Sequence, residues 1–225
     1  MKNKLLRLFY PQFLLLSIRL LELSLRNRII KIRDMYLYGY PRVFPPIKTI
    51  STELLLDILD IIIRPGMKIC DIGTGSGILA IYAAKKGGIV TATDISNESI
   101  HATTINARLN KVSLRILKGD LFEPVKGEKF DLIIFNPPYF PLDKEDALGR
   151  AACAGKGYRT IIRFLINLPY HLKKNGICLI TLSSLMNVEK ILEIAKINGL
   201  KISELVRVRG SPGENIMIFL LRLGS

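Results

Sequence analysis

The chain is poor in the residues on which several common kinds of site depend. It has no tryptophan and only 8% aromatic residues, so no base-stacking platform for a single nucleic-acid strand is apparent. Its two histidines, His101 and His171, stand alone on helical stretches without a metal partner at useful spacing. Its three cysteines (Cys70, Cys153 and Cys178) show no paired spacing, which excludes a disulfide framework or a zinc site. We therefore expect no metal site, and we interpret the cysteines as reduced, buried residues of a cytoplasmic protein.

Acidic residues and long apolar runs are also scarce. There are 19 Asp and Glu against 33 Lys and Arg, a net charge of +14, and ten of these basic residues lie within residues 1–48. No run approaches the roughly 20 apolar residues that a transmembrane helix needs. We expect residues 1–42 to form a basic, leucine-rich helical extension, with an amphipathic helix after Pro11. Three interpretations of it stay open: a helix packed on the domain, an arm that binds RNA or a ribonucleoprotein, and a membrane-surface helix.

The remaining residues, 43–225, read as one α/β domain with 49% hydrophobic residues over the whole chain, enough for a core. Helical and strand patterns alternate, which predicts a doubly wound, seven-stranded, mostly parallel sheet with an antiparallel last strand. The predicted helices are Ser51–Ile63, Ile78–Lys86, Glu98–Asn110, Tyr158–Leu172 and Asn187–Asn198. The predicted strands are Ile69–Ile72, Ile89–Asp94, Leu114–Lys118, Phe130–Phe135, Ile177–Ser183, Lys201–Arg209 and Asn215–Arg222.

A glycine-rich turn follows the first of these strands. The segment Asp71-Ile72-Gly73-Thr74-Gly75-Ser76-Gly77 has the spacing G-x-G-x-G directly before a predicted helix. Glycines allow a sharp turn and a close approach of a ligand, and the N–H groups of the next helix favour a carboxylate. The Asp71 carboxylate could accept from an ammonium group. Together these groups suit the amino-acid end of a ligand.

The next two strands also end in acids. Asp94, followed by Ile95, lies about twenty residues after the glycine turn, where an acid can accept from both hydroxyls of a ribose. Asp120 can accept from an adenine amine while Leu121 packs on the ring. Amino acid, ribose and adenine together describe S-adenosylmethionine. Any one of these acids could be a solvated strand end, but three in this order favour a cofactor site.

The strand Phe130–Phe135 runs into the turn Asn136-Pro137-Pro138-Tyr139. Because proline fixes φ and has no N–H, this turn can present the Asn136 side-chain oxygen and the Pro137 carbonyl as two acceptors. Two acceptors that face one point suit a planar –NH₂ group, which has two hydrogens to donate. We expect Tyr139 to stack on or close over that group.

These motifs resemble those of the class I S-adenosylmethionine-dependent methyltransferases. The similarity extends to the HemK-type protein-glutamine N5-methyltransferases, in their short archaeal and eukaryotic branch. It rests on Gly-Thr-Gly-Ser-Gly at 73–77, Gly-Asp-Leu-Phe at 119–122 and Phe-Asp-Leu-Ile-Ile-Phe-Asn-Pro-Pro-Tyr at 130–139, and more weakly on Val43-Phe44-Pro45-Pro46 and Ala154-Gly155-Lys156-Gly157. The resemblance implies an enzyme that methylates a glutamine of a translation release factor, and residues 43–225 would be its methyltransferase domain.

The site residues follow from the motifs and this resemblance. Three would be catalytic (Asn136, Pro137 and Tyr139), and Pro138 joins them as substrate-binding. The cofactor would be held by Asp71, Gly73, Thr74, Gly75, Gly77, Asp94, Ile95, Asp120, Leu121 and Asn136. In the short branch a small zinc-containing activator subunit covers an apolar edge of the sheet, and the extension could do so in cis instead.

A second acceptor class stays open. The exocyclic amine of adenine or guanine in RNA or DNA suits the same turn, provided that the base is flipped out. A third interpretation is a cofactor-binding subunit without catalysis, which the intact Asn136-Pro137-Pro138-Tyr139 turn disfavours.

Overall fold

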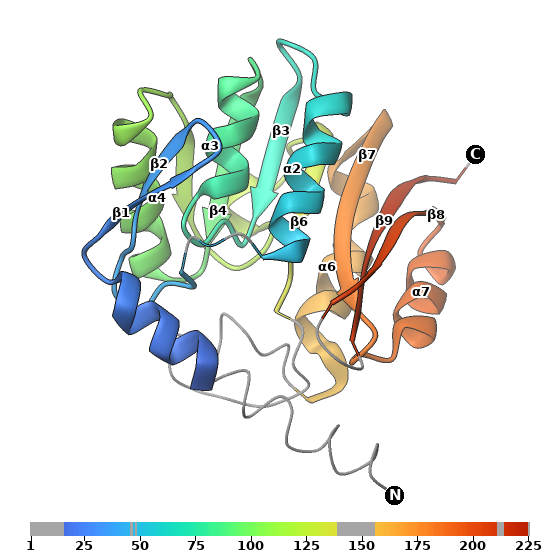
Figure 1. The fold of residues 1–225 in the computed structure, drawn as a ribbon. Helices are drawn as coiled ribbons and strands as arrows, with labels where there is room; N and C mark the ends of the chain where they lie inside the picture. Colours follow the sequence, from blue (N-terminus) through green and yellow to red (C-terminus); the bar gives the residue numbers. More distant parts are fainter. Residues whose placement is uncertain (1–15, 46, 48, 139–155, 211–213, 225) are drawn as a thin grey trace, which may run out of the picture.

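The structure is a computed structural model that describes residues 16–45, 47, 49–138, 156–210 and 214–224. A central twisted sheet is covered by helices on both faces, and a small hairpin lies against one of the helical layers (Figure 1). The three layers are those expected of a doubly wound α/β fold.

The sheet has seven strands in the order β5-β4-β3-β6-β7-β9-β8. Neighbours from β5 to β7 are parallel, and β9 is antiparallel to both β7 and β8. The predicted fold, with its antiparallel last strand, is confirmed. The strands are β3 (Lys68–Ile72), β4 (Ile89–Asp94), β5 (Arg115–Lys118), β6 (Phe130–Phe135), β7 (Leu172–Ser183), β8 (Leu200–Arg209) and β9 (Asn215–Leu223).

The helices agree closely with the expected ranges. They are α2 (Ile50–Ile62), α3 (Ile78–Lys85), α4 (Asn97–Leu109), α6 (Arg159–His171) and α7 (Val188–Ile197), with short 3₁₀ helices η1 (Glu123–Val125) and η2 (Lys156–Tyr158). Polar N-caps explain where three of them begin: the side chains of Thr49, Ser96 and Asn187 accept from the first turns of α2, α4 and α7. Strand β7 begins at Leu172 instead of Ile177, because Leu172 pairs with Phe130 beyond a register shift.

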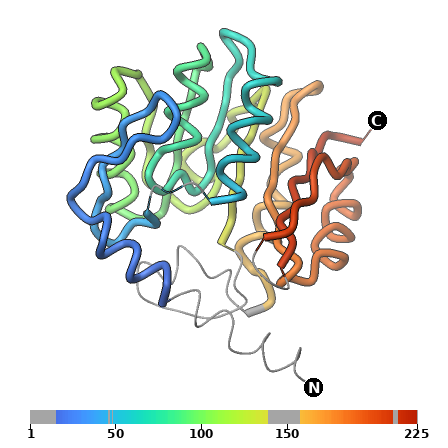
Figure 2. The backbone as a smooth tube through the Cα atoms, in the orientation of Figure 1, coloured from blue at the N-terminus to red at the C-terminus, as the bar shows by residue number. Residues whose placement is uncertain are grey.

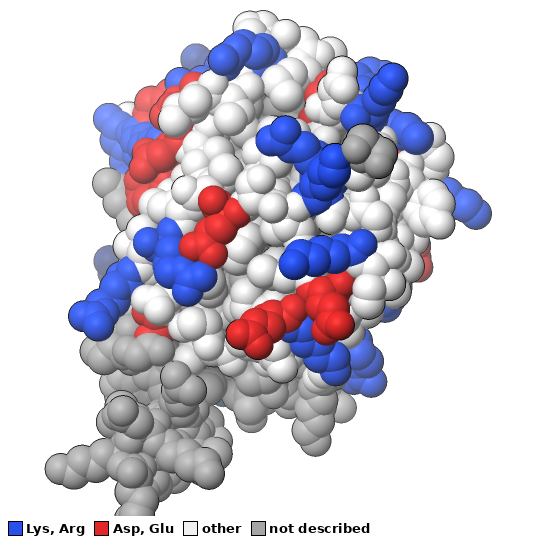
Figure 3. Space-filling model, turned by 90° about the vertical axis from the view of Figure 1, so that its right-hand side faces the viewer, with Lys and Arg blue, Asp and Glu red and all other residues white. Residues whose placement is uncertain are grey.

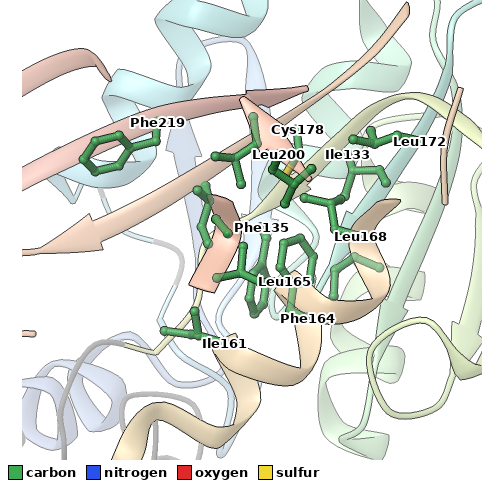
Figure 4. Packing of buried hydrophobic residues seen from close by; sticks show 14 of the residues in the cluster. Ile133, Phe135, Ile161, Phe164, Leu165, Leu168, Leu172, Cys178, Leu200 and Phe219 are labelled. Atoms are coloured by element: carbon green, nitrogen blue, oxygen red, sulfur yellow. The ribbon is translucent and has the colours of Figure 1, made fainter. Parts of the chain in front are cut away.

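The core lies on both faces of the sheet. The residues of α2, α3 and the hairpin pack on one face with Leu132 and Ile134 of β6. On the other face, Phe135 of β6 packs with Phe164 of α6, their ring centroids 4.1 Å apart (Figure 4). Because alternate residues of a strand point to opposite faces, β6 is buried on both sides and its end is held firmly.

The N-terminal segment is helical only in part. Residues 16–25 form a helix, on which Ile18 and Glu22 are buried. The prediction of a helical extension over residues 1–42 is wrong for residues 29–38, which form an antiparallel hairpin of β1 (Ile29–Ile32) and β2 (Met35–Tyr38). Alternation in β1 and β2 explains the hairpin: Ile32, Met35 and Leu37 are buried in the core while their neighbours face outward.

The hairpin is anchored on the helical layer beside α2, α3 and α4 (Figure 2). Arg33 in its turn donates to Glu53 and Asp60 of α2 and to the Tyr82 hydroxyl of α3. Strands β1 and β2 form a sheet of their own, so they do not extend the seven-stranded sheet. The suggestion that the N-terminal extension covers an apolar edge of the sheet in cis stays a prediction.

Charges of both signs are distributed over the face that includes β8 (Figure 3). Lys and Arg side chains spread across it with Asp and Glu among them. On β8, Arg207 pairs with Glu204. Charged side chains on an edge strand oppose pairing with another chain. Among the described residues, no helix has the length and apolar character to cross a membrane.

Candidate cofactor and acceptor site

The predicted motifs lie together at one edge of the sheet. In the parallel register Ile72 is opposite both Thr93 and Phe135, and Asp94 is opposite Lys118. Strands β3, β4, β5 and β6 therefore end side by side. The strand order reverses between β3 and β6, and this is where open α/β sheets bind their ligands.

The glycine turn is shaped by left-handed backbone. Gly73, Gly75 and Gly77 have φ values of 68°, 58° and 84°. A Cβ at Gly77 would lie 2.9 Å from Thr103 Cγ2, so α4 packs directly on the turn. On Gly75, by contrast, a Cβ would meet no atom of the described residues within 4 Å. One side of the turn is thus packed on protein while its outer side leaves space for a ligand.

Asp71 lies fully inside the site. Its side chain is buried in β3 and accepts from Thr74 Oγ1 at 2.7 Å. Burial, with a smaller contribution from the negative charge of Asp94, raises the pKa of Asp71 to about 7, although the Thr74 hydrogen bond opposes this. An ammonium group beside Asp71 would favour its charged form, as predicted for the amino-acid end of the cofactor.

Asp94 binds the glycine turn. Its two carboxylate oxygens accept from the N–H groups of Gly75 and Ser96, both at 2.9 Å. Burial raises the pKa of Asp94, and these backbone hydrogen bonds oppose the shift. Each carboxylate oxygen has a second lone pair, so acceptance from ribose hydroxyls remains compatible with these contacts. Ile95 is 59% exposed and available to a ligand.

Asp120 has a partner that the sequence did not indicate. Arg163 of α6 donates to Asp120 Oδ2 at 2.7 Å. The turn is held in place by the N–H of Gly119, which donates to the Asp94 carbonyl, and by Leu121, whose φ is 51°. The carboxylate expected to accept from adenine is thus already oriented by an arginine. An ion pair 43 residues apart in sequence leaves no local pattern.

The acceptor turn begins where β6 ends. Asn136 and Pro138 are half-buried and Pro137 is buried. Phe135, directly before them, stacks on Phe164, which fixes the direction in which the chain leaves the sheet. Tyr139 lies outside the described residues, so its predicted role stays a prediction. The same holds for the predicted roles of Asn136, Pro137 and Pro138.

Two further groups on α4 hold the glycine turn. Thr103 Oγ1 donates to the Gly75 carbonyl at 3.1 Å, and Asn106 Nδ2 donates to the Ser76 carbonyl at 2.9 Å. Neither contact was predicted from the sequence, because polar residues on a helix more often face water. His171, to which no role was assigned, stacks on Phe122. In the part of the chain that the structure describes, no cluster of three His, Cys, Asp or Glu could hold a metal ion.

The comparison with protein families decides the class of the chain. A family model described as the methyltransferase small domain matches residues 41–199. The chain belongs to this family. The match includes every described residue of the glycine turn, the strand-end acids and the acceptor turn, so the predicted site of this methyltransferase lies within the matched residues.

Known relatives of this methyltransferase include protein methyltransferases. A protein of Methanocaldococcus jannaschii, provisionally named a protein N5-glutamine methyltransferase, is 35% identical over 196 residues, covering 84% of this chain and 96% of the relative. Methyltransferase HEMK2 of Homo sapiens is 34% identical over 165 residues, covering 67% of this chain and 77% of the relative. The release factor glutamine methyltransferase of Lactococcus lactis is 36% identical over 114 residues, 50% and 42% of the two chains. The predicted HemK-type resemblance is confirmed.

Solved structures agree with the fold. The ribosomal protein L11 methylase of Lactobacillus delbrueckii matches with a TM-score of 0.62 and 26% identity, over 80% of this methyltransferase and 81% of that chain. The Mtq2–Trm112 complex of E. cuniculi, described as responsible for methylation of the termination factor eRF1, matches with a TM-score of 0.64 and 21% identity. The match covers 82% of this chain and 99% of that chain. The T. thermophilus 16S rRNA methyltransferase RsmC, in complex with AdoMet and guanosine, matches with a TM-score of 0.65 and 19% identity, over 89% of this chain and 50% of that chain. The last two likenesses, below 25% identity, show the fold alone.

Proposed function

We propose that this methyltransferase transfers the methyl group of S-adenosylmethionine to the side-chain nitrogen of a glutamine in a translation release factor. The observation that carries the proposal is the 35% identity with the relative named for N5-glutamine methylation, which extends over 96% of that relative. The relative of Lactococcus lactis named for release factor glutamine supports the choice of substrate.

The residues present fit the cofactor. None of the described residues fills the outer side of the glycine turn at Gly75, and α3 begins directly after the turn. Helix N-terminal N–H groups favour the carboxylate, and Asp71 favours the ammonium group. Asp94 would accept from the ribose and Asp120 from the adenine amine. When bound, S-adenosylmethionine supplies an electrophilic methyl group on a sulfonium centre.

The acceptor side would orient a poor nucleophile. An amide nitrogen reacts weakly because its lone pair is delocalised into the carbonyl. The Asn136 side-chain oxygen and the Pro137 carbonyl would each accept one N–H of the glutamine, which turns the lone pair toward the methyl group. The same two oxygens stabilise the positive charge that develops on nitrogen. No strong base is needed if the proton leaves after transfer.

A base in RNA or DNA is the second candidate acceptor. The charge of +14 favours it, because clustered positive charge attracts phosphate. A flipped adenine or guanine would offer its exocyclic amine to Asn136 and Pro137 in the same way. An RNA-binding or ribonucleoprotein-binding role of the basic N-terminal segment belongs with this candidate.

The test is labelled-methyl transfer from S-adenosylmethionine to matched acceptors. These are a release factor, the same factor with its candidate glutamine changed to alanine, and total RNA. We expect label in the release factor and none in the glutamine-to-alanine factor. Label in RNA alone would overturn the glutamine assignment and support the second candidate.

We also propose that a small zinc-containing activator subunit assists the reaction. The support is the resemblance to the short branch of the HemK-type family, in which such a subunit covers an apolar edge of the sheet. The same transfer assay, run with and without such a protein, tests this. Full activity of the chain alone, with no complex by size-exclusion chromatography, would contradict it.

A further inference from the structure

Two asparagines, Asn106 in α4 and Asn110 at its C-cap, bind the N-terminal hairpin. Asn110 accepts from the N–H of Tyr36 at 3.0 Å and donates to its carbonyl at 2.6 Å. Asn106 accepts from the N–H of Tyr38 at 2.6 Å and donates to its carbonyl at 3.4 Å. Each side-chain amide pairs with both backbone groups of one residue, as a neighbouring strand would. The two asparagines are therefore equivalent toward β2.

They differ toward the glycine turn. Asn106 Nδ2 also donates to the Ser76 carbonyl at 2.9 Å, whereas the second contact of Asn110 is with the Asn106 carbonyl of its own helix. Asn106 is fully buried, so its amide cannot exchange these partners for water. It joins segments that lie 68 and 30 residues away from it in sequence.

Holding a carbonyl also fixes the direction of an N–H group. In a trans peptide the C=O of one residue and the N–H of the next point in opposite directions. Thr103 holds the Gly75 carbonyl toward α4, so the Ser76 N–H points away from α4, to the outer side of the turn. Asn106 holds the next carbonyl, Ser76, on the same helix. Together they orient the turn at which the ligand carboxylate is expected.

We propose that Asn106 is a positioning residue of the cofactor site, through which the N-terminal hairpin controls the affinity for the cofactor. The inference rests on the proposed cofactor. The hairpin orders the Asn106 amide, and the amide orders the glycine turn. A partner that binds or displaces the hairpin would then change cofactor affinity without contacting the cofactor.

The first experiment compares Asn106→Ala with Asn110→Ala. Binding of S-adenosylhomocysteine is measured by calorimetry, and the free energy of unfolding by urea denaturation. Both variants lose hairpin contacts and should lose stability, but only Asn106→Ala should weaken binding, by about tenfold, the equivalent of one lost buried hydrogen bond. Equal binding by the two variants would overturn the proposal.

A second variant pair guards against a failure of Asn106→Ala to fold. Asn106→Asp keeps an acceptor for the Tyr38 N–H but places a carboxylate against the Ser76 carbonyl. Thr103→Val keeps the shape that packs on Gly77 and removes only the hydrogen bond to Gly75. Both should weaken binding. Unchanged affinity in both would overturn the proposal.

Amide hydrogen exchange gives a readout that a purely structural role would not change. Coupling between two sites is reciprocal, so S-adenosylhomocysteine should slow exchange of the Tyr38 amide in the unmodified protein and in Asn110→Ala. In Asn106→Ala this protection should be lost. No ligand-induced protection in the unmodified protein would overturn the inference. If the unmodified protein does not bind S-adenosylhomocysteine at all, the proposed function fails first.

Discussion

The two halves of the candidate site are held in place by different interactions. At the ends of β3, β4 and β5, where the cofactor is expected, hydrogen bonds to polar side chains hold the chain. After β6, where the acceptor is expected, the packing of aromatic rings holds it. Asp94 and Thr74 hold the glycine turn, whereas the acceptor turn leaves the sheet from Phe135, stacked on Phe164. The carboxylates among these polar groups, Asp71 and Asp94, are also titratable, while the aromatic rings on the acceptor side are not.

The difference separates two tasks. The cofactor carries charges at several points, so it needs oriented N–H groups and carboxylates whose own burial costs free energy. The proposed acceptor amide is neutral and needs two oxygens, those of the Asn136 side chain and the Pro137 carbonyl, held in fixed positions. Substitutions on the cofactor side should therefore change affinity and pH dependence, and those on the acceptor side should change stability or turnover.

The largest effect is expected from the aromatic packing of Phe164 on Phe135, behind the acceptor turn. Phe164→Ala should lower the free energy of unfolding by about 3–5 kcal/mol, since a fully buried aromatic side chain leaves a cavity. Tyr170→Ala, on the same helix but 70% exposed, is the control and should change it by less than about 0.5 kcal/mol. Urea denaturation measures both. Similar losses of unfolding free energy in the two variants would show that the packing of Phe164 does not hold the acceptor side.

Next in size is the loss of the acceptor oxygen. Asn136→Ala should lower kcat by about 100- to 1000-fold, as for other preorganised transition-state contacts, while S-adenosylhomocysteine still binds. Asp94→Ala is the matched control on the other side of the comparison and should mainly weaken cofactor binding. Transfer kinetics and calorimetry give the two quantities. Normal turnover by Asn136→Ala would refute its role.

Asp71→Asn should separate stability from binding. The folded pKa of Asp71 is raised to about 7, against 3.8 ordinarily, so its folded carboxyl keeps a proton that the unfolded chain has released. Stability is lost as pH rises from about 4 to about 7 and stays lost above that range. The variant removes this penalty and should be more stable at pH 8 by about 2–4 kcal/mol without ligand.

The same variant should bind the cofactor more weakly, by about tenfold, because the ammonium group loses its counter-charge. Denaturation at pH 5 and pH 8 is the measurement, with calorimetry at pH 8. An identical pH dependence of stability in both proteins would show that Asp71 is not the titrating group.

The smallest effect should come from the ion pair beside the adenine site. Arg163 and Asp120 are 53% and 28% exposed, so their interaction contributes about 0.2–1 kcal/mol. Arg163→Gln should weaken S-adenosylhomocysteine binding by about twofold to fivefold and reduce preference over S-inosylhomocysteine, which lacks the adenine amine. Arg115→Gln removes a comparable surface pair with Glu128 and should change neither value. An unchanged preference in Arg163→Gln would exclude this role.

The sheet and the ends of its strands could be predicted from sequence because those signals are local. The glycine turn, Asp94 and the Asn136 turn each follow an apolar strand directly, and parallel strands bring such ends to one edge. The hairpin was missed because its four-residue strands lie in a basic, leucine-rich segment that reads as a helix. Asn106 and Arg163 were missed because their partners are distant in sequence.

One consequence of the paired asparagines concerns the edge of the hairpin itself. A two-stranded sheet has exposed N–H and C=O groups on both sides, which another copy of the chain could pair with. At Tyr36 and Tyr38 these groups are already used by Asn110 and Asn106. The two side chains thus occupy the template on which an intermolecular sheet would grow, so their loss should make the protein more prone to aggregate during expression and storage.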